Sequence, residues 1–146
     1  MEDQTIKSTA EFCSVAGIAI ADFVGVANNV RKNVRVIRQP KKDGTYRIIY
    51  SPSEKLKEIQ KAIKKHYLEN YKYPSYVFGL GGTTLRQHAL VHQGSDILVK
   101  LDIRDYFPSI HHQKLFTVWR DVFGCEPQHA RLLTMLTSCD GYMQQG

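Results

Sequence analysis

One apolar segment, Ile97 to Ile103, constrains the fold more than any other feature of this chain. Its side chains alternate as in a β-strand, and one face carries Ile97, Val99, Leu101 and Ile103. Asp102 interrupts the other face, although a carboxylate rarely lies inside a buried strand because removing it from water is costly. We therefore expect a central strand whose terminal carboxylate is held by a divalent metal ion or by dense hydrogen bonding.

Asp102 alone makes only part of a metal site. Mg²⁺ takes oxygen ligands, commonly one or two protein carboxylates together with substrate phosphates. Asp105 follows closely, but it suits a helix N-cap or an architectural role better than a second metal ligand. The alternative for Asp102 is that it caps the turn after the strand without a metal.

Positive charge is concentrated in one part of the sequence. The formal net charge is +6, and Asp43 is the single acid between residues 31 and 47. The cations there are Arg31, Lys32, Arg35, Arg38, Lys41, Lys42 and Arg47. A second basic group is Lys55, Lys57, Lys61, Lys64 and Lys65. Such concentration favours a polyanionic partner, because neutralised phosphates release condensed counterions; the alternative is a solvated basic face.

The first half of the chain predicts helices, a hairpin and another helix. Apolar spacing over residues 8–30 predicts two short helices with a break at Gly17. Residues 34–50 predict a basic β-hairpin whose turn is Lys41 to Gly44. The next helix is expected to have Ser51 as its cap in an S-x-x-E capping box. Its buried stripe is Leu56, Ile59, Ile63 and Tyr67.

The second half predicts three more helices around the Ile97 to Ile103 strand. They cover residues 84–92, 114–123 and 128–137, before an open, turn-like end at 141–146. The helix at 114–123 is expected to face inward through Leu115, Val118, Trp119 and Val122. With 42% hydrophobic residues, the chain can bury a core as one α+β domain.

The cysteines and the N-terminus bear on location. Cys13, Cys125 and Cys139 are odd in number and far apart, so neither a disulfide framework nor a CxxC metal site is indicated. The most apolar stretch, Val15 to Ala27, is short and contains Asp22. We predict no membrane segment, no export and a cytoplasmic location.

Several segments, in order, carry a family resemblance. The segment LDIRDYFPSI, Leu101 to Ile110, resembles the first palm motif of reverse transcriptases, and Lys41 to Ile49 resembles their fingers hairpin. Leu56 to Gln60 resembles the helix that follows the hairpin in the bacterial retron group. His88 to His92 is similar to the retron N-A-x-x-H box, with His at its first position, and Met143 to Gly146 resembles the L-P-Q-G segment with Met and Gln replacing Leu and Pro.

The resemblance implies a polymerase right-hand fold, represented by fingers and a partial palm after a short N-terminal helical segment. Residues 1–33 would be that helical segment, 34–96 the fingers-like region and 97–146 the partial palm. Asp102 would be the first catalytic and metal-binding carboxylate, beside the Ile103 carbonyl, in a two-Mg²⁺ site.

The same resemblance implies a nucleotide site. Arg47, and less directly Lys41, would hold the incoming triphosphate. Phe107 would block a ribose 2′-hydroxyl and so select deoxynucleotides. Gln145 would lie against the nucleotide, and Gly146 would let the backbone approach it. Taken singly, Phe107 is typical of a core aromatic, Arg47 of a sheet-surface cation and Gln145 of a loop residue.

Two further groups of side chains have competing interpretations. His88 and His92 share a helix face, but nothing close in sequence completes a tetrahedral zinc site, so we do not predict one. Tyr71, Tyr73 and Tyr76 can stack on bases, although core packing is the more ordinary use.

The implied activity is RNA-directed DNA synthesis on an RNA template, with a DNA or RNA primer and deoxynucleoside triphosphates. The retron resemblance also implies a role in phage defence. The family's aromatic-x-Asp-Asp motif is absent, so we expect the chain to be incomplete, inactive alone and associated with a complementary polypeptide or an effector protein. The alternatives are a non-catalytic RNA-binding remnant, one half of a split polymerase, or a group II intron-like maturase.

Overall fold

The computed structural model describes residues 6–79 and 82–143. Its α-helices are α1 (Thr9–Ala16), α2 (Ile20–Ala27), α3 (Glu54–Ile63), α4 (Leu85–Leu90), α5 (Tyr106–Ser109), α6 (His112–Thr117) and α7 (Pro127–Thr137). Its strands are β1 (Val34–Pro40), β2 (Tyr46–Pro52), β3 (Ser138–Cys139) and β4 (Tyr142–Met143). Short 3₁₀ or π-helical segments are η1 (Val30–Asn33), η2 (Lys64–Leu68) and η3 (Val118–Val122). This mixture is consistent with the predicted α+β class.

The chain forms two units, which are described separately. Unit 1 comprises Met1–Asn70 and Asp105–Gly146, and unit 2 comprises Tyr71–Arg104. Segments from both ends of the sequence thus build unit 1. The predicted division into a helical segment (1–33), a fingers-like region (34–96) and a partial palm (97–146) has other boundaries than these two units, and it stays a prediction.

The two N-terminal helices are confirmed, with the break at Gly17. Ser8 caps α1 by accepting from the Glu11 amide, and the Glu11 carboxylate accepts from the Ser8 amide in return. Gly17 ends the helix with φ +67°, a left-handed conformation that glycine adopts at little cost. The chain then turns into α2, and the pair is bent by 113°.

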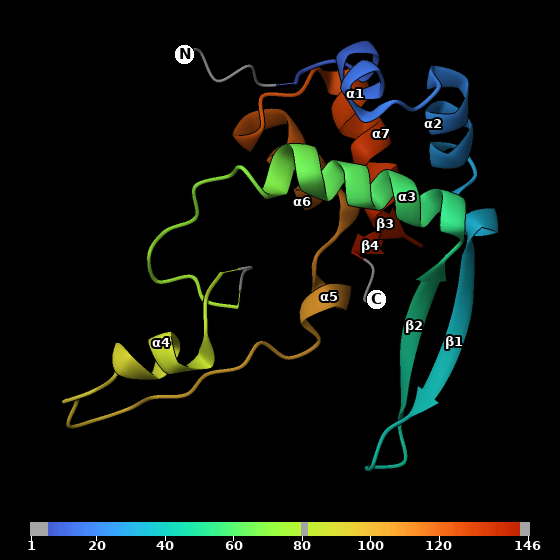
Figure 1. Ribbon diagram of the computed structural model, residues 1–146. Coiled ribbons are helices and arrows are strands. Elements are labelled where there is room, and N and C mark those ends of the chain that lie inside the picture. The colour runs from blue at the N-terminus through green and yellow to red at the C-terminus, as the bar shows by residue number, and fades with distance from the viewer. Residues whose placement is uncertain (1–5, 80–81, 144–146) are drawn as a thin grey trace. The chain divides into compact units, whose positions relative to one another are not determined.

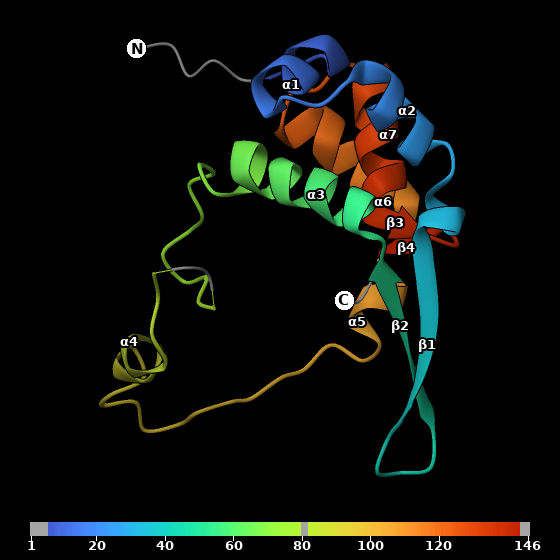
Figure 2. The ribbon, with the colours of Figure 1, turned by 45° about the vertical axis from the view of Figure 1, so that its right-hand side comes forward.

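The predicted hairpin is also confirmed, and it projects from the helices of unit 1 (Figures 1 and 2). Strands β1 and β2 pair antiparallel from Val34 opposite Pro52 to Pro40 opposite Tyr46. Because β2 runs to Pro52, it includes Ser51, which therefore cannot start α3. The cap is Ser53, whose hydroxyl accepts from the Leu56 amide, so the predicted Ser51 cap is wrong.

The core of unit 1 gathers around α7. The predicted α3 stripe of Leu56, Ile59, Ile63 and Tyr67 is buried, as expected. Helix α3 crosses α7 (Figure 1), where the Gln60 side chain donates to the Leu136 carbonyl at 2.8 Å. Phe12, Phe23 and Leu133 complete this core from α1, α2 and α7.

The helix that follows Pro108 is only partly as predicted. Trp119 is buried and Leu115 half-buried, but Val118 and Val122 are exposed, so their inward assignment is wrong. The cause is the wider π-helical turn of η3, which shifts the side chains relative to an α-helical stripe. Phe116 and Phe123 pack against the core instead.

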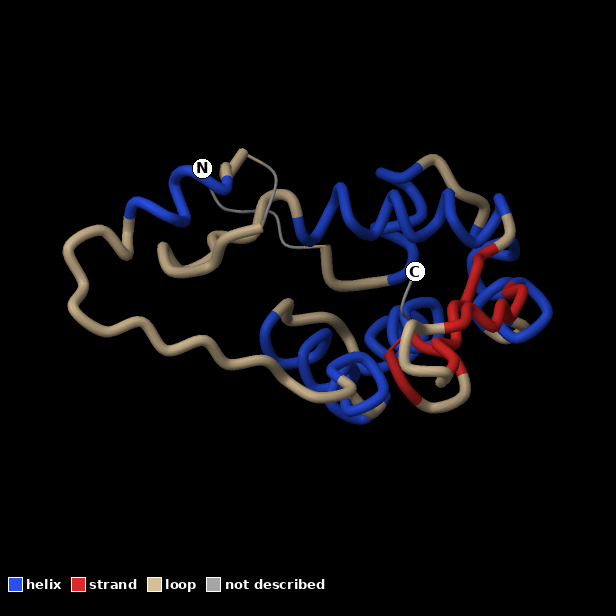
Figure 3. Tube along the Cα trace, turned by 90° about the horizontal axis from the view of Figure 1, so that it is seen from below, coloured by secondary structure: helices blue, strands red, loops and turns tan. Residues whose placement is uncertain are grey.

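In unit 2, residues 71–79 and 82–104 form α4 and otherwise loop (Figure 3). Helix α4 confirms the prediction for residues 84–92, and Thr84 caps it in a box with Gln87. The predicted strand at Ile97 to Ile103 is wrong for this structure, because no strand among the described residues pairs with it. Its side chains are exposed, with Leu101 89% accessible, so the alternating pattern finds no second layer to cover it.

Two sequence-based expectations concern the cysteines and membrane segments. Cys13, Cys125 and Cys139 are free thiols and are buried, and their burial raises the pKa of each. Within residues 6–79 and 82–143, no single helix has the length and apolar character to cross a membrane; α1 and α2 pass that test only as a bent pair.

Candidate nucleotide-binding and catalytic residues

The turn of the hairpin holds Lys41 and Arg47 at its two sides. The Lys41 amide donates to the Thr45 carbonyl at 2.7 Å, and Gly44 closes the turn with φ +81°. Asp43 accepts from the Thr45 hydroxyl at 2.6 Å and from its amide at 3.0 Å, which lowers the pKa of the Asp43 carboxyl. This carboxylate is thus committed to the turn.

Arg47 lies opposite Gln39 in the hairpin register, and its side chain is exposed. Neither Arg47 nor Lys41 forms an ion pair with another described residue. An exposed guanidinium on a paired strand keeps all its donors available for a phosphate. The hairpin therefore presents positive charge from a backbone position fixed by strand pairing.

Phe107 lies on α5 and is half-buried. Its ring meets that of Tyr106 edge-on, with centroids 5.3 Å apart. The end of α5 is tied to β4, because the Met143 amide donates to the Ile110 carbonyl at 2.9 Å. Phe107 and the start of the L-P-Q-G-like segment are thus joined within unit 1, while Gln145 and Gly146 lie outside the described residues.

Asp105 begins α5, as the N-cap prediction requires, with φ +48°. Its side chain makes no cap hydrogen bond, but its carbonyl accepts from the Ser109 amide at 2.9 Å. Non-glycine residues reach this left-handed region at some cost, and Asp is among those that tolerate it best. Asp105 therefore has the architectural role of starting the turn that carries Phe107.

Asp102 and Ile103 lie in unit 2, in the extended segment before α5. Both are exposed, which contradicts the expected buried carboxylate. The expectation assumed a covered strand, and without neighbouring strands the carboxylate stays in water. Asp102 consequently needs no counter-ion in this structure and is accessible to one.

The residues around Asp102 meet only part of what a magnesium site requires. No group of three His, Cys, Asp or Glu side chains in the described parts of the chain is arranged to hold an ion. One accessible carboxylate and an adjacent backbone carbonyl are oxygen donors of the kind Mg²⁺ takes, but they are too few to form a closed site. Asp102 and Ile103 can contribute to a magnesium site and cannot complete one.

His88 of α4 and His92, in the turn after that helix, contact neighbouring rings. His88 stacks on Phe78, with centroids 4.9 Å apart, and its Nε2 lies 3.4 Å from Nε2 of His92. The three tyrosines at 71, 73 and 76 are exposed, so their predicted core packing is wrong. The Tyr71 and Tyr73 rings meet edge-on with centroids 5.0 Å apart, and Tyr76 is the most exposed of the three at 79%.

The basic helix α3 and its extension η2 divide into a buried and a charged side. Lys55 pairs with Asp22 at 2.6 Å and Lys57 with Glu54 at 3.9 Å. Lys61, Lys64 and Lys65 are exposed. Because the stripe from Leu56 to Tyr67 is buried, these lysines must face water, where they are accessible to a nucleic-acid backbone.

A buried polar network was not predicted from the sequence. His129 of α7 is 1% exposed; its Nε2 lies 2.7 Å from the Tyr67 hydroxyl and its Nδ1 lies 3.0 Å from the Thr9 hydroxyl. The Tyr67 hydroxyl also donates to the Ile6 carbonyl at 3.2 Å. The sequence did contain a signal for the burial of His129, because this residue shares a helical stripe with Leu133 and Leu136.

Comparison with known proteins decides the family. A model of the reverse transcriptase (RNA-dependent DNA polymerase) family matches residues 39–145, more than half of the chain. The chain belongs to the reverse transcriptase family. The match begins on β1 and includes the hairpin turn, the segment around Asp102 and α5. The roles of individual residues within it stay predictions.

The retron assignment is confirmed by individual relatives. Retron Mx162 reverse transcriptase of Myxococcus xanthus is 36% identical over 86 residues, 58% of this chain and 16% of its own length. Retron Se72 reverse transcriptase of Salmonella heidelberg is 32% identical over 101 residues, 68% of this chain and 27% of its own length. Retron Ec48 reverse transcriptase of Escherichia coli is 28% identical over 119 residues, which make up 73% of this chain and 29% of the relative's own length. The chain thus spans less than a third of each of these relatives.

Proposed function

We propose that this chain supplies the fingers and first palm elements of a retron-type polymerase that synthesises DNA on an RNA template. The observation that carries the proposal is the family match over residues 39–145, a range that contains Lys41, Arg47, Asp102 and Phe107. For the whole polymerase, of which these 146 residues would be one part, we propose DNA synthesis on an RNA template and a role in phage defence.

Each residue is proposed to have one task. Arg47, with Lys41, binds the triphosphate and offsets negative charge as pyrophosphate departs. Asp102, beside the Ile103 carbonyl, offers oxygen ligands to Mg²⁺, which when bound stabilises the attacking and leaving oxygens of nucleotidyl transfer. The other carboxylates are proposed to come from a segment other than residues 1–146.

The sugar and base sides of the nucleotide are assigned to the α5–β4 region. The half-buried ring of Phe107 is proposed to exclude a 2′-hydroxyl, because burial fixes where its edge lies. Gln145 is proposed to lie against the nucleotide, and Gly146 is proposed to let the backbone approach it. In primer extension by the protein expressed from its natural reading frame, Phe107→Val should increase ribonucleotide use by roughly tenfold or more, and unchanged sugar selection would remove this assignment.

Lys61, Lys64 and Lys65 are proposed to bind the template or primer backbone without reading sequence. The exposed tyrosines of unit 2, Tyr76 above all, are proposed to stack on bases. A complementary polypeptide or effector protein remains part of the proposal as a further partner.

A binding experiment separates the polymerase from the non-catalytic RNA-binding remnant. A polymerase part should bind a primed RNA template more tightly when Mg²⁺ and the templated deoxynucleotide are added. Arg47→Gln should remove most of that gain, while Arg86→Gln on α4 should retain it. A remnant would bind with the same steep salt dependence whether or not Mg²⁺ or nucleotide is present, and that result would reject the proposal.

A further inference from the structure

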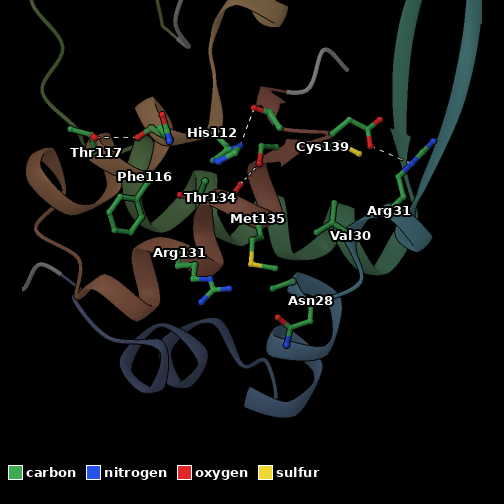
Figure 4. Close-up of a pocket in the computed structure, with 15 residues that line it drawn as sticks. Asn28, Val30, Arg31, His112, Phe116, Thr117, Arg131, Thr134, Met135 and Cys139 are labelled. Carbon is green, nitrogen blue, oxygen red and sulfur yellow. Dashed lines mark hydrogen bonds and ion pairs between the residues drawn. The ribbon is translucent and has the colours of Figure 1, made fainter.

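Unit 1 contains a pocket of about 660 Å³ between α2, α6 and α7. A volume of this size is typical of small-molecule sites. Figure 4 shows the α7 side chains Arg131, Thr134 and Met135 between His112 and Phe116 of α6 and the Asn28 to Arg31 segment. None of Asp102, Arg47, Lys41 or Phe107 lines it.

The pocket exists because α7 presents two different faces. His129, Ala130, Leu133 and Leu136 point into the core. Arg131, Thr134 and Met135 recur at helical spacing on another side of α7, and Ser138 follows at the start of β3; all four line the pocket. The Thr134 and Ser138 hydroxyls each donate to a backbone carbonyl of α7 at 2.7 Å, so neither hydroxyl proton is available to a ligand.

The charge of the lining favours an anion. Asp140 is the acid among the lining residues, and both of its oxygens are engaged, one by the Arg31 guanidinium at 3.4 Å and the other by the Tyr50 hydroxyl at 3.1 Å. Arg131 forms no ion pair within the described residues. Its guanidinium is therefore the uncompensated charge of the pocket, and its donors fit a phosphate.

The remaining lining favours a flat, partly apolar group beside that anion. Phe116 and Met135 offer an aromatic ring and a polarisable thioether, which pack well against planar rings. Asn28 and Gln113 add amides that can donate to and accept from ring edges. An inorganic anion would leave this apolar part of the pocket unused.

We propose that this pocket binds a nucleoside monophosphate unit, with its phosphate at Arg131 and its base against Phe116 and Met135. The unit can be a free nucleotide or a nucleotide of single-stranded RNA, and both present the same chemistry. The inference goes beyond the polymerase proposal and does not depend on Asp102 or on Mg²⁺.

The test measures binding of fluorescently labelled AMP, and of a 5′-phosphorylated RNA hexamer, to the chain in EDTA. We expect a dissociation constant on the order of 0.1–1 mM for AMP. Arg131→Gln should weaken binding by about tenfold or more, Arg131→Lys should weaken it less, and Arg86→Gln should leave it unchanged. Thermal unfolding of each variant checks that the fold is retained.

The two ligands identify the source. A hexamer that binds more tightly than AMP through Arg131 assigns the pocket to RNA, and equal binding assigns it to free nucleotide. Absence of binding by both ligands, or binding that a folded Arg131→Gln variant retains in full, overturns the proposal. Asp102→Asn should not alter the result, so failure here is separable from failure of the polymerase proposal.

Discussion

At the scale of single residues, His129 connects distant parts of unit 1. One set of proton positions satisfies the network: Thr9 donates to Nδ1, Nε2–H donates to the Tyr67 hydroxyl, and that hydroxyl donates to the Ile6 carbonyl. The arrangement requires a neutral imidazole. Burial lowers the pKa of His129 from 6.5 to about 4, in agreement with that requirement.

This shift predicts a loss of stability in mild acid. The unfolded chain takes up the proton near pH 6.5 and the folded chain only near pH 4, so the unfolded state binds more protons between these values. Stability is therefore complete above about pH 6.5 and falls as pH decreases towards 4, by on the order of 3 kcal/mol in total. Urea unfolding of the chain at several pH values measures it.

His129→Gln isolates the contribution of this residue to the pH dependence. The variant should be less stable at pH 7 and should lose less stability between pH 6.5 and 4 than the parent chain does. His88→Gln, on exposed α4, should reproduce the parent's pH dependence. A parent slope equal to that of His129→Gln would show that His129 is not held neutral.

Residue-scale prediction from sequence succeeded where local pattern decides the outcome and failed where a neighbour does. The α3 stripe from Leu56 to Tyr67 follows from spacing alone, and it is buried as predicted. Burial of Asp102 depended on partner strands that no local pattern reports. His129 was missed because its polarity concealed that its position lies on a buried stripe.

At the scale of elements, the junction between β2 and α3 shows how strand pairing overrides a cap motif. Ser51 and Glu54 have capping-box spacing, but Ser51 pairs with Arg35 in the hairpin. Ser53 takes over the cap, and its hydroxyl also donates to the Asn33 side chain at 3.1 Å. Two candidate caps that lie two residues apart cannot be ranked without knowing where the strand stops pairing.

The two serines make a matched pair for mutation. Ser53→Ala should destabilise the chain by about 1 kcal/mol, because the Leu56 amide loses its acceptor. Ser51→Ala should change the free energy of unfolding by less than about 0.5 kcal/mol. Denaturant titration of both variants decides between them; a larger loss for Ser51→Ala would restore the capping role to that residue.

The segment from Ile97 to Ile103 shows the limit of pattern at this scale. Alternating apolar side chains indicate that a segment is suited to form a β-strand. A strand also needs hydrogen-bonding neighbours and a layer on each face. Those neighbours are absent from the described residues. Exposed apolar side chains in a row, such as Leu98, Val99 and Leu101, are typical of a surface meant to be covered.

At the scale of the whole molecule, the chain order and the spatial order differ. Unit 1 joins Met1–Asn70 to Asp105–Gly146, while unit 2 is inserted between them and is largely exposed loop. Contacts of α3 and η2 with α7 hold the two parts of unit 1 together: the Gln60 side chain of α3 reaches Leu136, and Tyr67 of η2 reaches His129. No local pattern in the sequence predicts that residues 71–104 form a separate unit between the two parts of unit 1.

Limited proteolysis tests that organisation. Trypsin should cut first within residues 71–104, at sites such as Arg86 or Lys100, because these residues are exposed. The two resulting pieces should remain associated through the buried core of unit 1 and elute together from a sizing column. Early cleavage within α3 or α7, or separation of the pieces without denaturant, would contradict the division into units.

The relatives of this chain are reverse transcriptases much longer than the part that it matches. The chain spans 16% to 29% of the lengths of three retron reverse transcriptases, yet its family match includes the proposed triphosphate, metal and sugar-selecting residues. On this account Asp102 is the residue without which nucleotide addition stops, although its carboxylate is exposed in the structure.

The most direct measurement is RNA-templated primer extension by the protein expressed from its natural reading frame, with Mg²⁺ and deoxynucleotides. The account predicts DNA synthesis that falls by at least about a thousandfold in Asp102→Asn, because a metal-binding carboxylate is lost. Asp96→Asn, an exposed carboxylate of the same segment, should remain active. DNA synthesis by Asp102→Asn at the parent rate, or none by the parent protein, would contradict the central claim.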